Sequence, residues 1–323
     1  MAFWFRLRPA VRHCAEREKF RRGLEPANRA RSIGAAGVQQ RQRAAGTGMK
    51  RTRLALAALV LGIAGWSVGI EPGWLQQRQL VLAAPAWTGA PLTIAVAADF
   101  HVGAPHAGLP MLQRVVDELN AARPDLVLLP GDFVIQGVLG GQPVAPEDIA
   151  AVLAGLTAPL GVFATLGNHD WWLDGERVRK ALETAGIQVI DNRALPLASA
   201  DRRLWLAGIG DDMTGHARPD AAFAGVPADA RLIVMMHDPA NAAALPPQTV
   251  VAFAGHTHGG QVRLPLIGAL ITPGRVPRGH SWGWIPDAPA TTWVTAGIGT
   301  SILPIRFNCP PETVVLRVGG TDD

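Results

Sequence analysis

Short apolar runs of four to seven residues recur along this chain from residue 92 onward and constrain its fold more than any other feature. They are rich in Val, Ile and Leu, which is typical of buried β-strands. The runs lie at 92–98, 125–130, 160–166, 187–190, 203–208, 231–236, 249–254, 292–296 and 313–318. Helical patterns lie between them at about 108–122, 147–157, 172–185 and 239–244. This alternation predicts an α/β fold.

Side chains that can bind a metal follow five of these predicted strands. In chain order they are Asp99 and His101, Asp132, Asn168 and His169, His237, and the pair His256 and His258. Ligand sites in α/β sheets form at the carboxyl ends of strands, so we expect these groups to meet at one rim. A single histidine at such a place would more often be a structural group. Five such placements favour a common site.

The segment Gly255-His256-Thr257-His258-Gly259-Gly260 places two imidazoles one residue apart between glycines. Taken alone, it could be a polar turn. Histidine, Asp and Asn without Cys suit divalent cations such as Mn, Fe and Zn. The donors outnumber the ligands of one tetrahedral zinc, so two metals are implied, with Asp132 as the best candidate to bridge them. The sequence has no GxSxG elbow and no GxxxxGK[ST] loop, so neither a serine nucleophile nor a P-loop is supported.

The ordered motifs Asp99-x-His101, Gly131-Asp132, Gly167-Asn168-His169-Asp170, His237 and Gly255-His256-Thr257-His258 together resemble the calcineurin-like metallophosphoesterases. The resemblance covers about residues 77–320 and implies a four-layer α/β/β/α sandwich. Two departures are mild. Asp170 stands where Glu is frequent, and Phe follows both Asp99 and Asp132.

The resemblance also implies a role for each site residue. One metal would be bound by Asp99, His101 and His258, and the other by Asn168, His237 and His256, with Asp132 as the bridge. His169 would contact the phosphate and help the leaving group as an imidazolium, with Asp170 holding its ring. Arg263 and Arg306 are candidates for binding the substrate phosphate, and salt bridges at a surface or interface are the alternative.

Residues 54–70 contain no charge and follow a basic segment, Lys50-Arg51-Thr52-Arg53. At 1.5 Å per residue this run is about 26 Å long, enough to cross a bilayer core. An uncleaved anchor is favoured over a cleaved signal peptide, because the nearest small-x-small site, at 84–86, lies far beyond the run. A buried core helix is the third alternative. The basic flank predicts a cytoplasmic N-terminus and a catalytic domain on the extracytoplasmic side of the membrane.

The formal charge of +4 conceals an asymmetry. Residues 1–53 hold 14 of the 30 basic and 3 of the 26 acidic residues, which leaves 16 basic and 23 acidic residues beyond. We therefore expect no nucleic acid at the catalytic domain. Residues 1–48 are predicted to be a basic disordered tail, and translation could begin at Met49. The predicted organisation is this tail, an anchor with its flanks at 49–76, and a catalytic domain at 77–323.

Within the family, the segments GHTHGGQVRLP at 255–265 and GIGTSILPIRFNCPPE at 297–312 resemble the membrane-anchored bacterial branch. This implies a single-pass protein of the bacterial inner membrane. The predicted activity is dinuclear metal-dependent hydrolysis of a phosphoester by metal-bound hydroxide. The favoured substrate is a phosphodiester or a lipid-linked phosphoester, and a membrane lipid is a candidate. One alternative is a hydrolase of a nucleotide-linked lipid precursor, and another is a non-catalytic, metal-stabilised binding scaffold.

Overall fold

The computed structural model describes residues 28–84, 87, 90–198 and 203–319. Contacts divide the chain into two compact units, Met1–Leu59 and Val60–Asp323. The helix α1 (Asn28–Gly69) begins in the first unit and ends in the second. Residues 28–48 were expected to lack regular structure and are helical instead. They are rich in Ala, Arg and Gln, which are strong helix formers. Residues 1–27 lie outside the described part.

The C-terminal part of α1 and the turn after it, Met49–Gly73, are long and apolar enough to cross a membrane, by length and composition. Their mean hydropathy is 1.9, and only 6% of the apolar window is buried. A helix of a soluble core would bury this surface, so the core-helix alternative is not supported. The chain continues through the 3-10 turn η1 (Glu71–Gly73) directly into the first strand.

One six-stranded sheet has the order β1 (Gln76–Leu82), β14 (Glu312–Val318), β2 (Leu92–Val96), β3 (Leu126–Pro130), β4 (Val162–Thr165) and β5 (Gln188–Val189). The strands from β2 to β5 are parallel, and β14 pairs antiparallel with β2. The first strand, β1, pairs parallel with β14 at the edge of this sheet. The carboxyl ends of β2, β3 and β4 lie at one edge of this sheet.

A second six-stranded sheet has the order β12 (Gly283–Trp284), β13 (Thr292–Val294), β9 (Thr249–Ala254), β8 (Arg231–Met236), β7 (Leu204–Ile209) and β6 (Arg193–Pro196). Its four central strands are parallel, and both edge strands are antiparallel to their neighbours.

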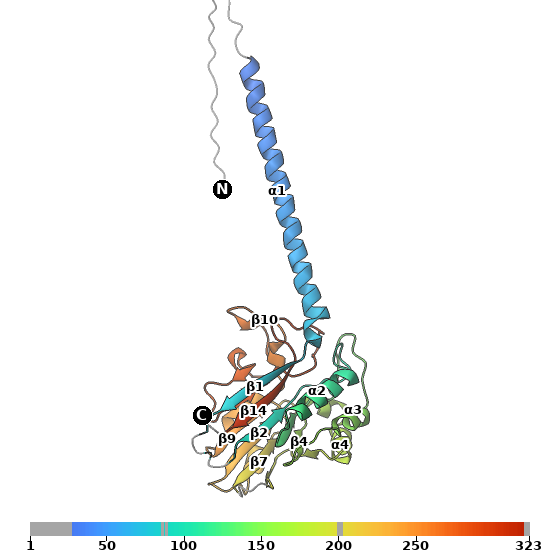
Figure 1. Ribbon diagram of the computed structural model, residues 1–323, viewed down its shortest axis with the longest axis vertical. Helices are drawn as coiled ribbons and strands as arrows, with labels where there is room; N and C mark the ends of the chain where they lie inside the picture. The colour runs from blue at the N-terminus through green and yellow to red at the C-terminus, as the bar shows by residue number, and fades with distance from the viewer. Residues whose placement is uncertain (1–27, 85–86, 88–89, 199–202, 320–323) are drawn as a thin grey trace, which may run out of the picture. The chain divides into compact units, whose positions relative to one another are not determined.

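Alternate residues of each central strand face different layers. Ile94, Leu128 and Phe163 of the first sheet pack against Ile233 and Val251 of the second. The other face of the first sheet packs against α2 (Leu109–Ala121), α3 (Pro146–Leu153) and α4 (Asn168–Thr184). The other face of the second sheet packs against α5 (Pro219–Phe223) and the 3-10 helix η2 (Pro239–Ala244). The molecule is thus the predicted four-layer α/β/β/α sandwich, with the three longer helices along one flank (Figure 1).

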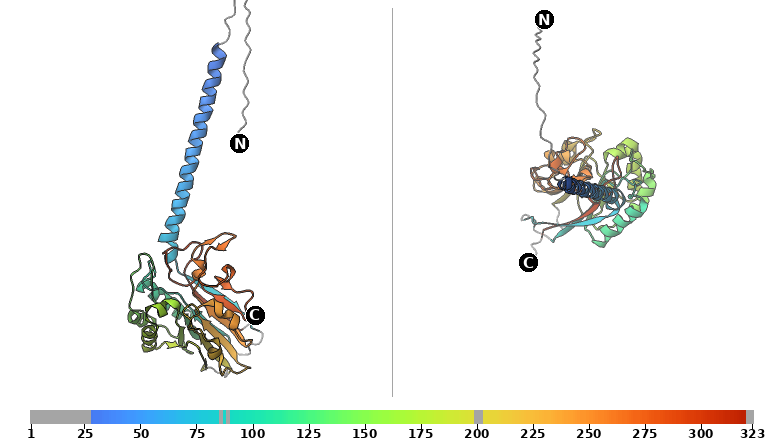
Figure 2. Two further views of the ribbon diagram at one scale, coloured as in Figure 1. Left: turned by 180° about the vertical axis from the view of Figure 1, so that it is seen from behind. Right: turned by 90° about the horizontal axis from the view of Figure 1, so that it is seen from above.

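The expected strands match the observed ones closely, whereas three helices differ. The helix predicted at 172–185 begins at Asn168, because Asp170 caps its first turn. The segment 239–244 is a 3-10 helix, and α3 ends at Leu153. The region 262–291 is mostly irregular, as expected, with short pieces β10 (Arg263–Leu264), β11 (Gly268–Ala269) and η4 (Arg278–His280). These loops lie on the flank away from α2 to α4 (Figure 2).

Candidate metal centre

The seven predicted metal ligands come together where the carboxyl ends of β2, β3, β4, β8 and β9 meet. All of them are buried. Six of them form two groups of potential ligand atoms, and within each group the atoms lie within 4.8 Å of one another. The first group is Asp99, His101, Asp132 and His258, and the second is Asp132, His237 and His256. Asp132 belongs to both.

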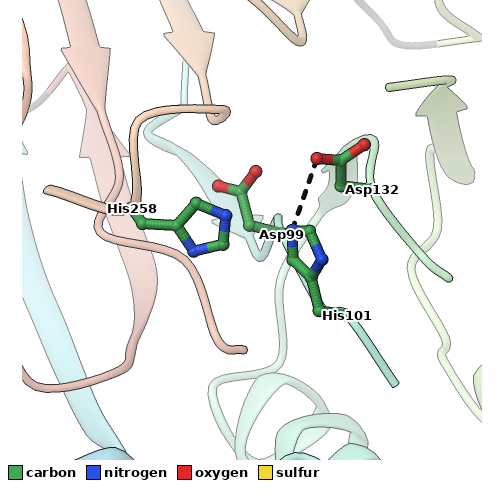
Figure 3. A group of neighbouring side chains, drawn as sticks. All are labelled: Asp99, His101, Asp132 and His258. Atoms are coloured by element: carbon green, nitrogen blue, oxygen red, sulfur yellow. Dashed lines mark ion pairs between the residues drawn. The ribbon is translucent and has the colours of Figure 1, made fainter. Parts of the chain in front are cut away.

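In the first group, side chains from three separate segments point toward one another (Figure 3). His101 Nε2 lies 3.3 Å from Asp132 Oδ2. The rings of His101 and His258 are 4.6 Å apart between centroids. Asp99 accepts a hydrogen bond from the backbone N–H of His256 at 2.7 Å, so it also links this group to the second.

In the second group, His237 Nε2 lies 3.3 Å from Asp132 Oδ2 and 3.1 Å from His256 Nδ1. Asn168 Oδ1, which was predicted to join this group, lies 3.1 Å from the same His237 nitrogen. The opposite ring nitrogen of His237 is 2.8 Å from the carbonyl oxygen of Pro130, which fixes the ring orientation.

Five of these residues have left-handed backbone conformations. The φ angles are 51° at Asp99, 41° at His101, 57° at Asp132, 69° at His256 and 50° at His258. Such conformations are rare for residues with a side chain and cost roughly 1–3 kcal/mol each. They persist where the surroundings hold them, and they are typical of functional sites.

Gly167 provides the space that Asp132 occupies. A Cβ atom at Gly167 would lie 2.3 Å from Asp132 Oδ1 and 2.7 Å from His237 Cε1. The first turn of α4 also contacts this carboxylate, because the His169 backbone N–H donates to the same Asp132 oxygen at 2.8 Å. Residue 167 must therefore be glycine for the Asp132 carboxylate to keep this position.

The protonation states suit metal binding. Burial opposes ionisation of Asp132, but His237 and His101 together outweigh it and hold the pKa of Asp132 well below its ordinary value. Burial lowers the pKa of His256 to about 4 and holds that of His258 well below its ordinary value. An ionised carboxylate and neutral imidazoles are the forms that bind metals. His237 is the exception. Burial lowers its pKa, but the carboxylates of Asp132, Asp99 and Asp211 together outweigh burial and raise it, so a metal would displace a proton there.

Unpartnered buried atoms show that the site suits cations. Asp99 Oδ2, His101 Nδ1 and His256 Nε2 are buried without a hydrogen-bond partner. Leaving such atoms unsatisfied is costly, and bound divalent cations would satisfy them. The donors are oxygen and imidazole nitrogen only, which fits hard or borderline metals.

Asp170 does not hold the His169 ring, and this part of the prediction is wrong. Its carboxylate accepts hydrogen bonds from the backbone N–H groups of Gly167, Asp132, Phe133 and Val134. These bonds cap α4 and fix the loop that carries Asp132. The Asp170 side chain is shorter than the Glu that is frequent at this position. Its carboxylate reaches the surrounding backbone, and His169 Nδ1 is left without a partner.

His169 faces a cavity of about 700 Å³ that Asp132, Asn168, His256 and His258 also line. Trp172 stands at the mouth, with its ring 4.9 Å from that of His169, whereas Trp171 packs flat on His216. Burial lowers the pKa of His169 to about 4, so the ring is neutral before an anion arrives. The imidazolium expected from the resemblance therefore requires a phosphate nearby, which would raise this pKa.

The two predicted phosphate-binding arginines have other contacts and do not line the cavity. Arg263 donates to the Gly259 carbonyl at 2.8 Å and to Ser281 Oγ at 2.9 Å. Arg306 is fully buried and donates to the carbonyls of Cys309, Ala296, Gly297 and Gly299. Both side chains organise loops beside the ligands, and neither is free to meet a substrate.

A buried network joins these loops to the end of α1. The Cys309 thiol donates to the carbonyl of the ligand His258 at 3.4 Å. Its backbone N–H donates to Glu71 Oε1, and the other oxygen of Glu71 accepts from Trp66 Nε1 at 2.6 Å. The Arg306 backbone N–H donates to the Ser67 carbonyl at 2.9 Å. The last turn of α1 is thus part of the support behind a metal ligand.

The sequence interpretation missed Asp211, which is fully buried next to the second ligand group. Its Oδ2 accepts from the Thr214 backbone and hydroxyl, and its Oδ1 has no partner. Its charge helps to raise the pKa of His237. Asp211 follows β7 in the same way that His237 follows β8, so the strand-end rule could have found it.

Comparison with known proteins agrees with the fold and the site. The family model described as calcineurin-like phosphoesterase matches residues 92–260. The chain is 30% identical to phosphodiesterase YaeI of Escherichia coli, over 77% of this chain and 90% of that protein. It is 31% identical to the uncharacterized metallophosphoesterase YkuE of Bacillus subtilis, over 65% of this chain and 73% of that protein. It is 24% identical to the UDP-2,3-diacylglucosamine pyrophosphatase LpxG of Chlamydia trachomatis, over 78% and 92%.

The fold and the clustered Asp and His residues define a metal-binding phosphoester hydrolase. The chain belongs to the calcineurin-like phosphoesterase family.

Replacing Gly167 tests the close approach at Asp132. Gly167→Ala is expected to weaken metal affinity about 10–100-fold, because the new methyl group displaces the shared carboxylate. Isothermal titration with Mn²⁺ measures this. Gly279→Ala is the matched control, since nothing lies within 4 Å of a Cβ there. Equal affinity in the two variants would contradict the packing argument.

Proposed function

We propose that this protein is a dinuclear metal-dependent hydrolase of phosphodiesters or lipid-linked phosphoesters, anchored to a membrane by residues 49–73. The observation that carries the proposal is the position of Asp132. Its carboxylate belongs to both groups of potential ligand atoms, and the two groups otherwise share no residue. A carboxylate common to two donor sets is what a pair of cations roughly 3.5–4 Å apart requires.

The distances support a ligand assignment. Asp99, His101 and His258 would hold one cation, and Asn168, His237 and His256 the other, with Asp132 between them. Two divalent cations (Mn, Fe or Zn) would supply Lewis acidity to the phosphoryl group and lower the pKa of an attacking water. The buried carboxylates and imidazoles keep the site rigid and exclude bulk water.

His169 is the proposed catalytic group of the chain itself. It lies beside the ligand cluster, with its ring 4.6 Å from that of His101, and it faces the cavity. Because His169 lines the cavity, a phosphate oxygen or a leaving alcohol bound there would lie next to its ring. A donor at that position would stabilise the charge that develops on the leaving oxygen.

The names of relatives support a phosphoester substrate of this kind. YaeI is described as a phosphodiesterase, and LpxG as a pyrophosphatase of UDP-2,3-diacylglucosamine. A nucleotide-linked lipid precursor is the second candidate substrate, and it would require a site that faces the cytoplasm. The basic residues before the apolar helix favour the opposite orientation, with residues 77–323 on the extracytoplasmic side of a bacterial inner membrane. A metal-stabilised binding scaffold is the non-enzymatic alternative, and the family relationship disfavours it.

Replacing the shared carboxylate tests the dinuclear centre. Asp132→Asn is expected to reduce the metal content from two ions per chain to one or none, because a neutral amide cannot bridge two cations. Metal analysis of the purified protein measures this, and Asp229→Asn, at an exposed turn, is the control. A variant that retains two ions per chain would rule out the bridge.

Replacing the proposed catalytic imidazole separates catalysis from metal binding. His169→Ala is expected to keep the metal content and to lose about 10²–10⁴-fold in turnover of bis-p-nitrophenyl phosphate. His280→Ala, in the irregular loop, should retain activity. Full activity of the His169 variant would remove the residue from the mechanism.

The orientation is tested with a reporter. A reporter enzyme that is active only outside the cytoplasm, fused after residue 323, is expected to be active in cells. A cytoplasmic reporter at the same junction should be inactive. The reverse pattern would favour the nucleotide-linked precursor as the substrate.

A further inference from the structure

Three loops around the cavity expose large apolar side chains, which we call the apolar rim: Leu139, Leu266, Ile267, Ile271, Ile302 and Leu303. Leu266 is 107% exposed, Ile271 77% and Ile302 72%. Contiguous exposed apolar surface of this kind is unusual on a soluble protein and marks an interaction site. Ile271, Ile302 and Leu303 also line the cavity that contains His169, so the rim borders the mouth of the catalytic site.

The three loops are bonded to one another. The Leu139 backbone N–H donates to the Ile302 carbonyl at 2.9 Å. Gln261 Nε2 donates to the Leu303 carbonyl at 3.1 Å, and the Arg263 backbone N–H donates to the Phe307 carbonyl at 2.9 Å. The hairpin of β10 and β11, with Leu266 and Ile267 at its tip, is therefore held beside the loop that carries Ile302.

Two rim residues have backbone conformations that disfavour their side chains. The φ angle is 66° at Leu266 and 63° at Ile302. A branched apolar residue with positive φ is an outlier, and Asn, Asp or Gly would suit such a turn better. Leu266 and Ile302 are thus exposed at the surface, although positive φ angles and contact with water are both unfavourable for such side chains.

The end of α1 indicates what covers the rim. The loop with Ile302 and Leu303 is bonded to this helix, because the Arg306 backbone N–H donates to the Ser67 carbonyl. Ser67 lies within the apolar segment that could cross a membrane. It is three residues before Ile70, the last residue of the uncharged run, which corresponds to about 4.5 Å along the helix axis. If that segment spans a bilayer, a loop bonded to Ser67 lies at the depth of the bilayer surface. Trp66 and Trp74 pack edge to face at this level, as is typical of the interface.

The charge around the rim is complementary to anionic lipid. The stretches 133–146, 259–286 and 296–311 contain no Asp or Glu. The exposed charged residues in them are Arg275 and Arg278. Basic residues near an anionic leaflet contribute about 1 kcal/mol each to binding, and acidic residues would oppose it.

We propose that the apolar rim rests in the interface of an anionic bilayer and opens the catalytic cavity to it, so that the substrate is a phosphodiester lipid whose acyl part stays in the membrane. Its hydrolysis consumes one water, breaks one P–O bond and gives a phosphomonoester and an alcohol. The substrate half of this proposal rests on the proposed function, whereas the membrane contact of the rim does not.

The membrane contact is tested with a fluorescent probe on the full chain. Ile267→Cys in a Cys14→Ser background is labelled with an environment-sensitive dye and placed in vesicles of phosphatidylcholine and phosphatidylglycerol. Cys309 remains unlabelled, because it is buried and burial raises the pKa of its thiol to about 11. The same label at Val81→Cys, a 58% exposed position in β1, is the control.

The expected result is blue-shifted emission at position 267, quenched at least twofold by spin-labelled lipid, and neither effect at position 81. Quenching equal to that of the control would overturn the proposal. A blue shift without lipid quenching would overturn it in favour of a protein that covers the rim.

The substrate half is tested with two diesters that share one leaving group. These are soluble bis-p-nitrophenyl phosphate and dioleoyl phosphatidyl-p-nitrophenol in the same vesicles. Replacing both tip residues, Leu266→Asp with Ile267→Asp, is expected to lower the ratio of lipid to soluble turnover at least tenfold. Asp tolerates the positive φ at position 266 better than Leu does. Val81→Asp should leave the ratio unchanged.

The other results of this assay separate the role of the rim from the lipid substrate and from the proposed function. An unchanged ratio in the tip variant overturns the role of the rim, while the phosphodiesterase assignment stands. Hydrolysis of the soluble diester alone by the unmodified protein overturns the lipid substrate. If the unmodified protein cleaves neither diester, the proposed function itself fails, although the probe experiment still reports on the membrane contact.

Discussion

The position of the Asp132 carboxylate is the constraint on which the rest of the centre depends. Its Oδ2 atom lies 3.3 Å from His101 Nε2 and 3.3 Å from His237 Nε2, and it joins two groups of donors, each of which draws residues from both sheets. Each sheet alone supplies an incomplete set. The sandwich is therefore more than a scaffold, because packing one sheet on the other brings the two half-sites into contact.

The backbone around this carboxylate is specialised to hold it. Asp170 accepts hydrogen bonds from four backbone N–H groups in the loops that carry Asp132 and His169. Gly167 leaves room for the Asp132 carboxylate. Left-handed conformations at the ligands add local strain, which the hydrophobic layers on both sides of the sheets offset. The backbone and the packing of the fold thus hold these side chains together.

The sequence predicted the α/β alternation and the ligand cluster well, because they follow from strand periodicity and from polar residues at strand ends. The four-layer sandwich was implied by the resemblance to the calcineurin-like family. It failed where the outcome depends on distances between side chains. Asp170 was expected at the His169 ring and binds backbone instead, and Arg306 was expected at the substrate and is buried among carbonyls. Asp211 was missed because no motif surrounds it. Spacing along the chain indicates which edge a residue occupies, and three-dimensional packing determines its partner.

The buried carboxylate of Glu71 connects the helix end to the loop behind His258. The folded unit accordingly begins at Val60, inside α1, rather than at the first strand. Anchor and enzyme are consequently not interchangeable modules. An exchange of the anchor during evolution would have to preserve the last turns of the helix together with Glu71, and a cut made just before β1 would remove part of the enzyme's own interior.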